Sequence, residues 1–305
     1  MLLLYTLTTL IGLVSAATFS NPLKSRDGSD PHIVYAEGYY SLMTTTWNDL
    51  RFTRAKTLEG LKTGESRIVY TDTNPARCCN VWAPELHNVT NTWYMYYTAG
   101  TRTTLDNQRS HVVRGPYGTS PWPAPGTSYT YAAQLTKDWG IDGTLLRLNS
   151  LTYFIYSWGW KVLSEPTLPW ERVRNPVNKG AAALSRGNRT WVAYSASDCW
   201  TDSYQLGLLT YKGGGADPML AGSWVKSSPV FSSANGNWGT GHNAFFTSSD
   251  GTEIWNVYHA TAVTTGNCDG NRYTAAKRVE WRADGTPDFG RADARGTVLV
   301  GPSGE

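Results

Sequence analysis

Five side chains capable of acid–base chemistry or hydrogen bonding stand at comparable points of five strand-like runs. They are Asp30, Glu85, Asp142, Lys179 and His242. An aspartate at the start of a strand can simply be a turn former that bonds its own backbone, and His242 can be a buried core histidine. The equivalent placement of these residues in different runs instead favours one shared pocket that they surround.

The five residues belong to stretches with one common plan: a polar anchor, a small apolar strand, a polar turn and an aromatic-rich strand. The stretches are residues 30–46, 82–100, 142–158, 178–196 and 241–260, and their aromatic strands begin near Tyr39, Trp93, Tyr153, Trp191 and Trp255. No long segment has helical periodicity. Each stretch has the composition of the first two strands of a propeller blade. The sequence therefore predicts an all-β fold, a five-bladed β-propeller in a single domain over residues 18–305.

The amino-acid composition indicates which kinds of ligand the protein could bind. Among 305 residues, 17% are charged, and there are 14 Trp and 18 Tyr. These two ring types combine a flat apolar face with a polar edge, which suits a surface that holds sugar rings, although most of them should fill a β-rich core. A net charge of +3 without a basic run predicts no nucleic-acid partner.

The first residues predict secretion. Residues 1–17 form an uncharged apolar run ending at Ser15, Ala16 and Ala17, which is typical of a signal peptide with its cleavage site. The run is short for a membrane span, which needs about 20 apolar residues, so no membrane partner is expected. Two sequons, at Asn88 and Asn188, fall in polar turns and predict glycosylation.

Four cysteines in an oxidising compartment allow three connectivities. A bridge between the adjacent Cys78 and Cys79, with a second between Cys199 and Cys268, is one arrangement. Free thiols and crossed pairings remain open from the sequence.

Several motifs resemble glycoside hydrolase family 43, especially its exo-acting α-L-arabinofuranosidase branch. They are "SDPHIVYAEGYY", "NVWAPELH", "WGIDGTLL", "VNKGAAAL", "YSASDCWTDSYQLGLL", "GHNAFF" and "EWRADGTPDFG", in the family's order. The resemblance implies a five-bladed propeller and inverting hydrolysis of O-glycosyl bonds in arabinose-containing plant polysaccharide. It also implies a secreted protein, expected to be monomeric, that requires no cofactor.

The resemblance assigns roles to three of the anchors. Asp30 takes the position of the general base, and Asp142 that of the aspartate that tunes the pKa of the acid. The family's general acid is the glutamate of a Val-Asn-Glu-Gly motif, and Lys179 stands there in this chain. Inverting hydrolysis needs one protonated carboxyl at the leaving oxygen and one carboxylate that activates water. Losing general acid assistance typically costs about 10²- to 10⁴-fold in rate.

Three glutamates could in principle donate the proton in place of residue 179. Glu85 follows the family's Trp-Ala-Pro-Glu pattern, which is not the acid's position, and Glu165 and Glu171 lie in a Pro-rich connection before Lys179. We expect the ammonium of Lys179 to form an ion pair with Asp30, Asp142 or both, because a buried unpaired charge is costly.

The remaining site residues are expected around these anchors. Trp82, Trp200 and Trp47 stand near anchor motifs and could stack on a sugar, and Arg272 could contact a sugar hydroxyl. By resemblance, His242 lies on the propeller axis and could bind a water molecule or a structural calcium ion.

Three functional hypotheses follow. The first is a secreted glycoside hydrolase of α-L-arabinofuranosidase type whose activity Lys179 has reduced. The second is a sugar-binding protein that has kept the pocket and lost catalysis. The third is an arabinanase or β-xylosidase, because loops set the depth of the pocket. Turnover of an arabinofuranoside with a good leaving group separates the first two.

Overall fold

A computed structural model describes residues 17–159 and 161–305. The signal peptide predicted over residues 1–17 therefore lies almost entirely outside the described residues. Within the described ranges, no helix has the length and apolarity needed to cross a membrane.

Five antiparallel hairpins form where the repeats predict them. They are β2 (His32–Ala36) with β3 (Tyr39–Met43), β6 (Cys79–Val89) with β7 (Thr92–Gly100), β10 (Ile141–Leu148) with β11 (Leu151–Ser157), β12 (Asn178–Arg186) with β13 (Arg189–Ala196), and β16 (Trp238–Thr247) with β17 (Ile254–Thr261). The polar turns between the two strands of each pair end the apolar runs and reverse the chain.

Outer strands extend four of these hairpins into larger sheets. They are β4 (Leu50–Ala55) and β5 (Glu65–Tyr70), β8 (Arg109–Tyr117) and β9 (Thr130–Gln134), β14 (Gln205–Tyr211) and β15 (Trp224–Lys226), and β18 (Tyr273–Arg278). The β10–β11 sheet gains no third strand within the described residues. The chain after it forms only the isolated bridges Trp158–Lys161 and Val162–Ser164.

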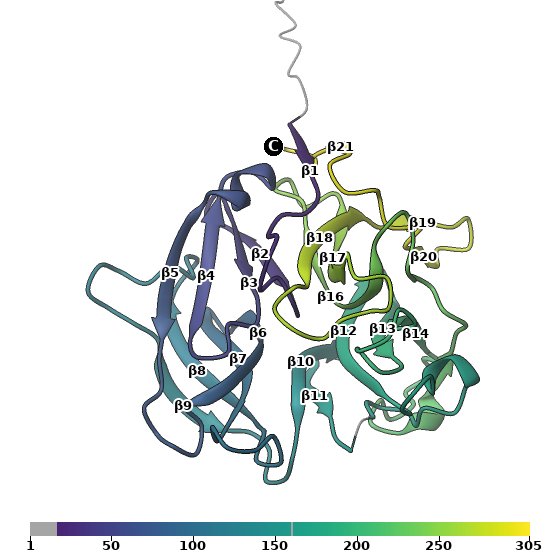
Figure 1. The fold of residues 1–305 in the computed structure, drawn as a ribbon, viewed down its shortest axis with the longest axis horizontal. Helices are drawn as coiled ribbons and strands as arrows, with labels where there is room; N and C mark the ends of the chain where they lie inside the picture. Colours follow the sequence, from purple (N-terminus) through teal and green to yellow (C-terminus); the bar gives the residue numbers. More distant parts are fainter. Residues whose placement is uncertain (1–16, 160) are drawn as a thin grey trace, which may run out of the picture.

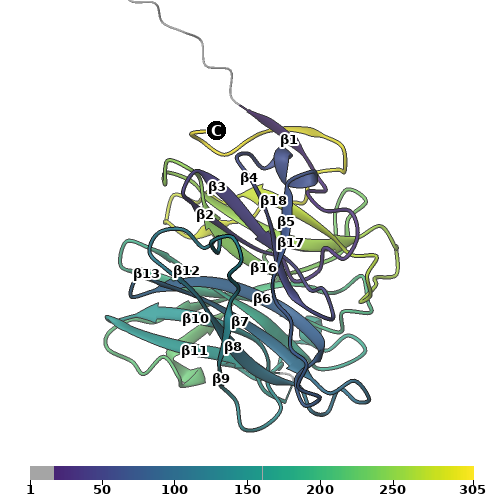
Figure 2. The same cartoon turned by 90° about the vertical axis from the view of Figure 1, so that its left-hand side faces the viewer.

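The short elements lie outside these sheets. β1 (Thr18–Ser20) pairs with β21 (Val298–Val300), which joins the two ends of the described chain, and β19 (Glu280–Trp281) pairs with β20 (Pro287–Asp288). Figure 2 shows β1 and the carboxyl terminus together at one end of the molecule. The helical pieces are the 3₁₀ turns η1 (Glu59–Lys62), η2 (Pro169–Glu171) and η3 (Ala221–Ser223).

The first strands of the sheets form a closed ring. β2 contacts β6, β6 contacts β10, β10 contacts β12, β12 contacts β16, and β16 contacts β2. In Figure 1 these strands lie nearest the centre, and the later strands of each sheet lie progressively further out. The fold is therefore an all-β propeller, as predicted.

The hydrophobic core lies between neighbouring sheets. One cluster packs Trp191 and Leu206 of the β12–β15 sheet against Tyr258 and Tyr273 of the β16–β18 sheet. The rings that open the aromatic strands are largely buried, with Trp191 fully enclosed. Most aromatic residues thus serve the core, and the central axis is left to the ends of the inner strands.

Candidate active site

Every inner strand has a residue with a left-handed backbone within its first five positions or just before it. These corner residues are Asp30 (φ 54°), Ala83 (φ 46°), Asp142 (φ 56°), Gly180 (φ 59°) and His242 (φ 42°). The register of β6, β10, β12 and β16 shifts at this point, as in a β-bulge. Left-handed residues other than glycine are uncommon and concentrate at functional sites.

The five anchors do not all occupy the same position relative to the corner, contrary to the expectation from the sequence. Asp30, Asp142 and His242 are corner residues, but Lys179 precedes the corner residue Gly180, and Glu85 comes two residues after Ala83. The Glu85 carboxylate lies 2.8 Å from His87 Nε2 and 4.0 Å from His32 Nε2. Glu85 thus contacts these histidines rather than any of the other four anchors.

Side chains from neighbouring sheets hold four of the corners. The amide of Ala83 donates to Thr45 Oγ1 at 2.9 Å, that of Asp142 to Thr98 Oγ1 at 3.1 Å, that of His242 to Ser195 Oγ at 2.6 Å, and that of Asp30 to His259 Nδ1 at 3.1 Å. Each acceptor comes from the sheet that precedes the corner around the ring. Sheet-to-sheet hydrogen bonds therefore set the position of the anchors.

The Asp30 carboxylate is held on both oxygens. Thr45 Oγ1 donates to Oδ2 at 2.6 Å, while His242 Nδ1 and Arg272 Nη1 lie 3.0 and 3.4 Å from Oδ1. Although burial favours the neutral acid, the charges of Arg272 and His242 hold the pKa of Asp30 well below its usual range. Asp30 is therefore an ionised carboxylate, the form that a base needs to take a proton from water.

Asp142 has a different environment. Burial raises the pKa of Asp142 above its usual value, and the charges of His242 and Lys179 offset only part of that rise. Its Oδ2 lies 3.9 Å from His242 Nδ1 and has no hydrogen-bond partner within the described part of the chain. The two aspartates flank one imidazole and have pKa values shifted in opposite directions, a pattern associated with acid–base pairs.

The two histidines of the site have pKa values that are shifted in opposite directions. Burial alone would lower the pKa of His242, but Asp30 and Asp142 raise it above its usual value. Burial and the Arg272 charge lower the pKa of His259 to about 3. His259 is therefore neutral, accepts the Asp30 amide through Nδ1 and stacks on Tyr204, with ring centroids 5.6 Å apart and planes 7° apart.

Lys179 does not pair as we expected. Its ammonium lies over the Tyr204 ring, 5.6 Å from the centroid, and it forms no ion pair among residues 17–159 and 161–305. Its neighbour Gly180 is close to His242, because a Cβ on Gly180 would come within 3.0 Å of the imidazole. Arg272 and His242 instead neutralise Asp30. The predicted ion pair was wrong: among the described residues no carboxylate lies within ion-pair distance of the Lys179 ammonium, which points to the Tyr204 ring, even though Asp142 Oδ2 has no hydrogen-bond partner there.

The glutamates considered as substitute acids have other contacts. Glu171 is fully buried and bonded by Tyr194, Asn178, the Leu168 amide and Lys226, so it fixes the chain under β12. Glu165 pairs with Lys161 at the surface. Neither glutamate contacts Asp30, Asp142 or His242.

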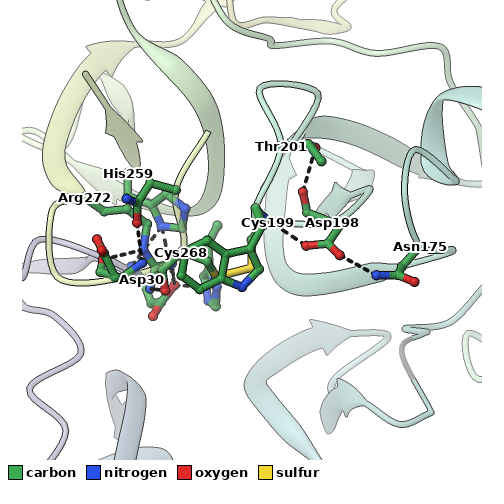
Figure 3. Close-up of a disulfide and its surroundings, with 12 residues drawn as sticks. Asp30, Asn175, Asp198, Cys199, Thr201, His259, Cys268 and Arg272 are labelled. Atoms are coloured by element: carbon green, nitrogen blue, oxygen red, sulfur yellow. Dashed lines mark hydrogen bonds and ion pairs between the residues drawn. A yellow bond between two sulfur atoms is a disulfide. The ribbon is translucent and has the colours of Figure 1, made fainter. Parts of the chain in front are cut away.

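The structure pairs Cys78 with Cys79 and Cys199 with Cys268. The second bridge joins the loop after β13 to the loop before β18, beside Arg272 and Asp30 (Figure 3). Arg272 Nη2 donates to the Cys268 carbonyl at 3.2 Å, and its Nε donates to the Asp269 carbonyl at 3.1 Å. The disulfide-bonded loop thus holds the guanidinium that faces Asp30, and most Arg272 donors already have protein partners.

The three tryptophans expected to hold sugar lie in different environments. Trp47 and Trp82 pack edge to face, with ring centroids 6.1 Å apart. Trp82 Nε1 is buried and has no hydrogen-bond partner within the described residues. Trp200 is half exposed, at 50%, and follows Cys199 directly. Of these indoles, the exposed ring of Trp200 is suited to contact with a sugar face, whereas the Trp82 N–H is buried.

The two sequons also lie in different places. Asn188 is exposed in the turn between β12 and β13, as expected. Asn88 lies inside β6 rather than in a turn, pairs with Trp93 across the hairpin, and donates through Nδ2 to the Gly118 carbonyl at 3.1 Å. The prediction of a turn at Asn88 was therefore wrong, because β6 continues to Val89.

The surroundings of His242 do not fit a calcium ion at its Nδ1 edge. Calcium takes six to eight oxygen ligands. Among the described residues, the carboxylates near Nδ1 are those of Asp30 and Asp142, and the Arg272 cation already lies against Asp30. No group of three metal-ligating side chains in the described ranges includes His242.

Thr45, Ser195, Tyr204 and His259 complete the site and were not singled out from the sequence. A signal for two of them exists. The aromatic strands end in Tyr194-Ser195 and Tyr258-His259, as they do in Tyr97-Thr98 and Tyr156-Ser157. In three of these four pairs, the polar residue after tyrosine accepts a hydrogen bond from the neighbouring corner; Ser157 does not.

Comparison with known proteins shows the family to which the chain belongs. Residues 19–287 match the family model described as "Glycosyl hydrolases family 43". The "Extracellular exo-alpha-(1->5)-L-arabinofuranosidase" of Streptomyces avermitilis is 32% identical over 93% of this chain and 66% of that protein. The "Alpha-L-arabinofuranosidase 43" of Humicola insolens is 32% identical over 86% of this chain and 61% of that protein. This chain thus spans under two thirds of the length of these relatives.

A solved structure has the same fold along nearly its whole length. The crystal structure of an α-L-arabinofuranosidase from Lactobacillus brevis superposes with a TM-score of 0.79 and 27% identity, covering 92% of this chain and 98% of that one.

Proposed function

We propose that this chain, which belongs to glycosyl hydrolase family 43, is a secreted glycosidase of the α-L-arabinofuranosidase type with reduced activity on natural linkages. The arrangement of Asp30, His242 and Asp142 carries the proposal. It supplies an ionised, firmly positioned carboxylate beside a second carboxyl with a raised pKa. The names of its relatives support arabinose-containing plant polysaccharide as the substrate.

We also propose that the propeller has five blades in one domain over residues 18–305. The closed ring of five inner strands supports this count, with the β10–β11 hairpin as a reduced third blade. On this reading the corner residues of all five blades surround the substrate pocket.

Asp30 would act as the general base. It takes a proton from the attacking water, which adds to the anomeric carbon as the bond to the leaving oxygen breaks, and the configuration inverts. Thr45 and Arg272 orient the carboxylate and keep it ionised. Asp142 and His242 surround the reacting centre. No step in this scheme uses a metal ion.

The leaving oxygen lacks a carboxylic acid to protonate it. The family resemblance places that acid at residue 179, where the side chain is an ammonium over Tyr204. Because Arg272 and His242 rather than Lys179 neutralise Asp30, the base stays functional. The protein should therefore hydrolyse substrates whose leaving group needs no proton and act slowly on sugar–sugar linkages.

A test compares two substrates. We expect turnover of 4-nitrophenyl α-L-arabinofuranoside and little hydrolysis of an α-1,5-linked arabino-oligosaccharide. Asp30→Asn should lower the first rate by at least about 10²-fold, the scale of general base catalysis. Unchanged turnover in Asp30→Asn would remove Asp30 from this role.

Lys179 also favours a second candidate, a sugar-binding protein without catalysis. Saturable binding of the oligosaccharide with no turnover of either substrate would support that candidate and contradict a hydrolase.

A further inference from the structure

A second cavity lies along the inner strands, away from the corner residues. Its volume is about 490 Å³, and side chains from β2, β6, β10, β12 and β16 line it. Asp30, Asp142, Lys179 and His242 do not line this cavity. The cavity therefore belongs to a different stretch of the inner strands from the one that carries the candidate active site.

His32 and His87 line this cavity, and the Glu85 carboxylate lies directly beside both of them. His32 comes from β2, and Glu85 and His87 come from β6, two residues apart and so on the same side of that strand. One ligand atom from each side chain can be chosen so that all three lie within 4.8 Å of one another. We call these three residues the histidine–glutamate cluster. It joins the first two sheets of the ring.

The cluster has the donors that transition metals prefer. Burial lowers the pKa of His32 to about 4, so its imidazole is neutral at pH 7. Burial works against ionisation of Glu85, but the hydrogen bond from His87 and the nearby imidazoles lower the pKa of this carboxyl. Two imidazoles and one carboxylate suit zinc and related ions, whereas calcium prefers oxygen ligands alone.

The distances are close to those of a metal site. With zinc–ligand bonds of 2.0–2.1 Å, tetrahedral ligand atoms lie about 3.3 Å apart. Glu85 Oε2 is 2.8 Å from His87 Nε2 and 4.0 Å from His32 Nε2. Side-chain rotations that move the ligand atoms by less than about 1 Å would bring both separations to this value. Water from the cavity could supply the fourth ligand.

Two neighbouring groups, the Leu86 amide and the Arg147 guanidinium, disfavour a cation at the cluster, and each has only a weak effect. The Leu86 amide points at His32 Nδ1 from 3.5 Å, a long contact that metal binding at Nε2 would have to give up. Arg147 also lines the cavity, but its Nη2 donates to the Asn88 carbonyl.

We propose that His32, Glu85 and His87 bind one divalent transition-metal ion, with Zn²⁺ as the best fit, in a site separate from the candidate active site. The ion would join β2 to β6 and so stabilise the contact between the first two sheets. Binding to the folded state alone raises stability in proportion to the logarithm of metal concentration over Kd.

The test uses the full secreted chain without a polyhistidine tag, stripped with a chelator and titrated with Zn²⁺ by calorimetry. We expect one Zn²⁺ per chain and a rise in Tm on binding. Glu85→Gln and His87→Gln should each weaken binding by at least about 10²-fold, because even groups that only orient metal ligands account for 10- to 100-fold. His87 is partly exposed, so its variant should fold normally.

Glu165→Gln, which removes an exposed carboxylate far from this cluster, is the matched control and should bind Zn²⁺ as the parent does. Co²⁺ in the parent should give the visible absorption of a four-coordinate ion, and this absorption should vanish in His87→Gln. Absence of saturable one-to-one binding would overturn the proposal. Equal affinity in His87→Gln and the parent would also overturn it, because the metal would then lie elsewhere.

Discussion

Replacing Lys179 by glutamate should raise the hydrolysis of an unactivated arabinofuranoside by about 10²- to 10⁴-fold, the usual contribution of a general acid. At 1.36 kcal/mol per tenfold change, this is about 2.7–5.4 kcal/mol of transition-state stabilisation. The gain requires a base that already works. Asp30 meets this condition because its neutralising partners are Arg272 and His242, which the substitution leaves in place.

The surroundings of residue 179 suit a protonated carboxyl. A glutamate there would be partly buried and near Asp142, and both desolvation and a like charge raise a carboxyl pKa. Lys179 makes no ion pair among the described residues, so its loss should change the free energy of unfolding by no more than about 0.5 kcal/mol. The expected rate gain is thus separable from a change in folding.

The assay measures kcat/KM for methyl and 4-nitrophenyl α-L-arabinofuranosides with the parent, Lys179→Glu and Lys179→Gln. Lys179→Gln removes the charge without supplying an acid and is the matched control. The methyl glycoside should gain far more than the nitrophenyl glycoside, whose leaving group needs little protonation. The parent's rate should fall only as low pH protonates Asp30, and Lys179→Glu should add a fall at high pH as the new acid ionises.

Three results would refute this reasoning. An equal gain with Lys179→Gln would show that the charge, not the missing acid, limits the rate. Equal gains on both substrates would show that proton donation is not what was restored. No gain on either substrate, with unchanged folding, would show that the pocket differs from an active one at more than residue 179.

Further outcomes follow from the contacts of other residues. Glu171→Ala should lower the free energy of unfolding, measured in urea, by about 3–5 kcal/mol, because Lys226 would be left largely buried without its partner. Glu165→Ala, at the surface, should change it very little. Equal losses in the two variants would contradict the role given to Glu171. Opening the Cys199–Cys268 bridge with the double serine variant should loosen the loop that holds Arg272 and raise the pKa of Asp30. Activity on the nitrophenyl substrate is present above that pKa and lost as pH falls through it, so the acid limb of the pH profile should move to higher pH; an unmoved limb would contradict the coupling. Asn188→Gln should remove one N-glycan from protein secreted by a eukaryotic host, whereas Asn88→Gln should leave the mass of the attached glycans unchanged, as intact-mass measurement would reveal.

The sequence determined the propeller largely through local pattern. The fivefold repeat of a small apolar strand, a polar turn and an aromatic strand can be seen without tertiary information, and all five predicted hairpins form. The same repeat placed Asp30, Asp142 and His242 near the strand starts. These three residues do meet, because the first strands of all the sheets converge on one axis.

What only the tertiary structure decided was the direction of each side chain at that axis. A shift of one or two residues from the left-handed corner separates Lys179 and Glu85 from their expected partners. The bulge that creates this shift depends on pairing with the next strand and on amides held by Thr45, Thr98, Ser195 and His259 of neighbouring sheets. Such contacts join residues far apart in the chain. Local sequence pattern therefore does not show which side chains lie next to Asp30. Arg272 and His242 reach it, and Lys179 is left over the ring of Tyr204.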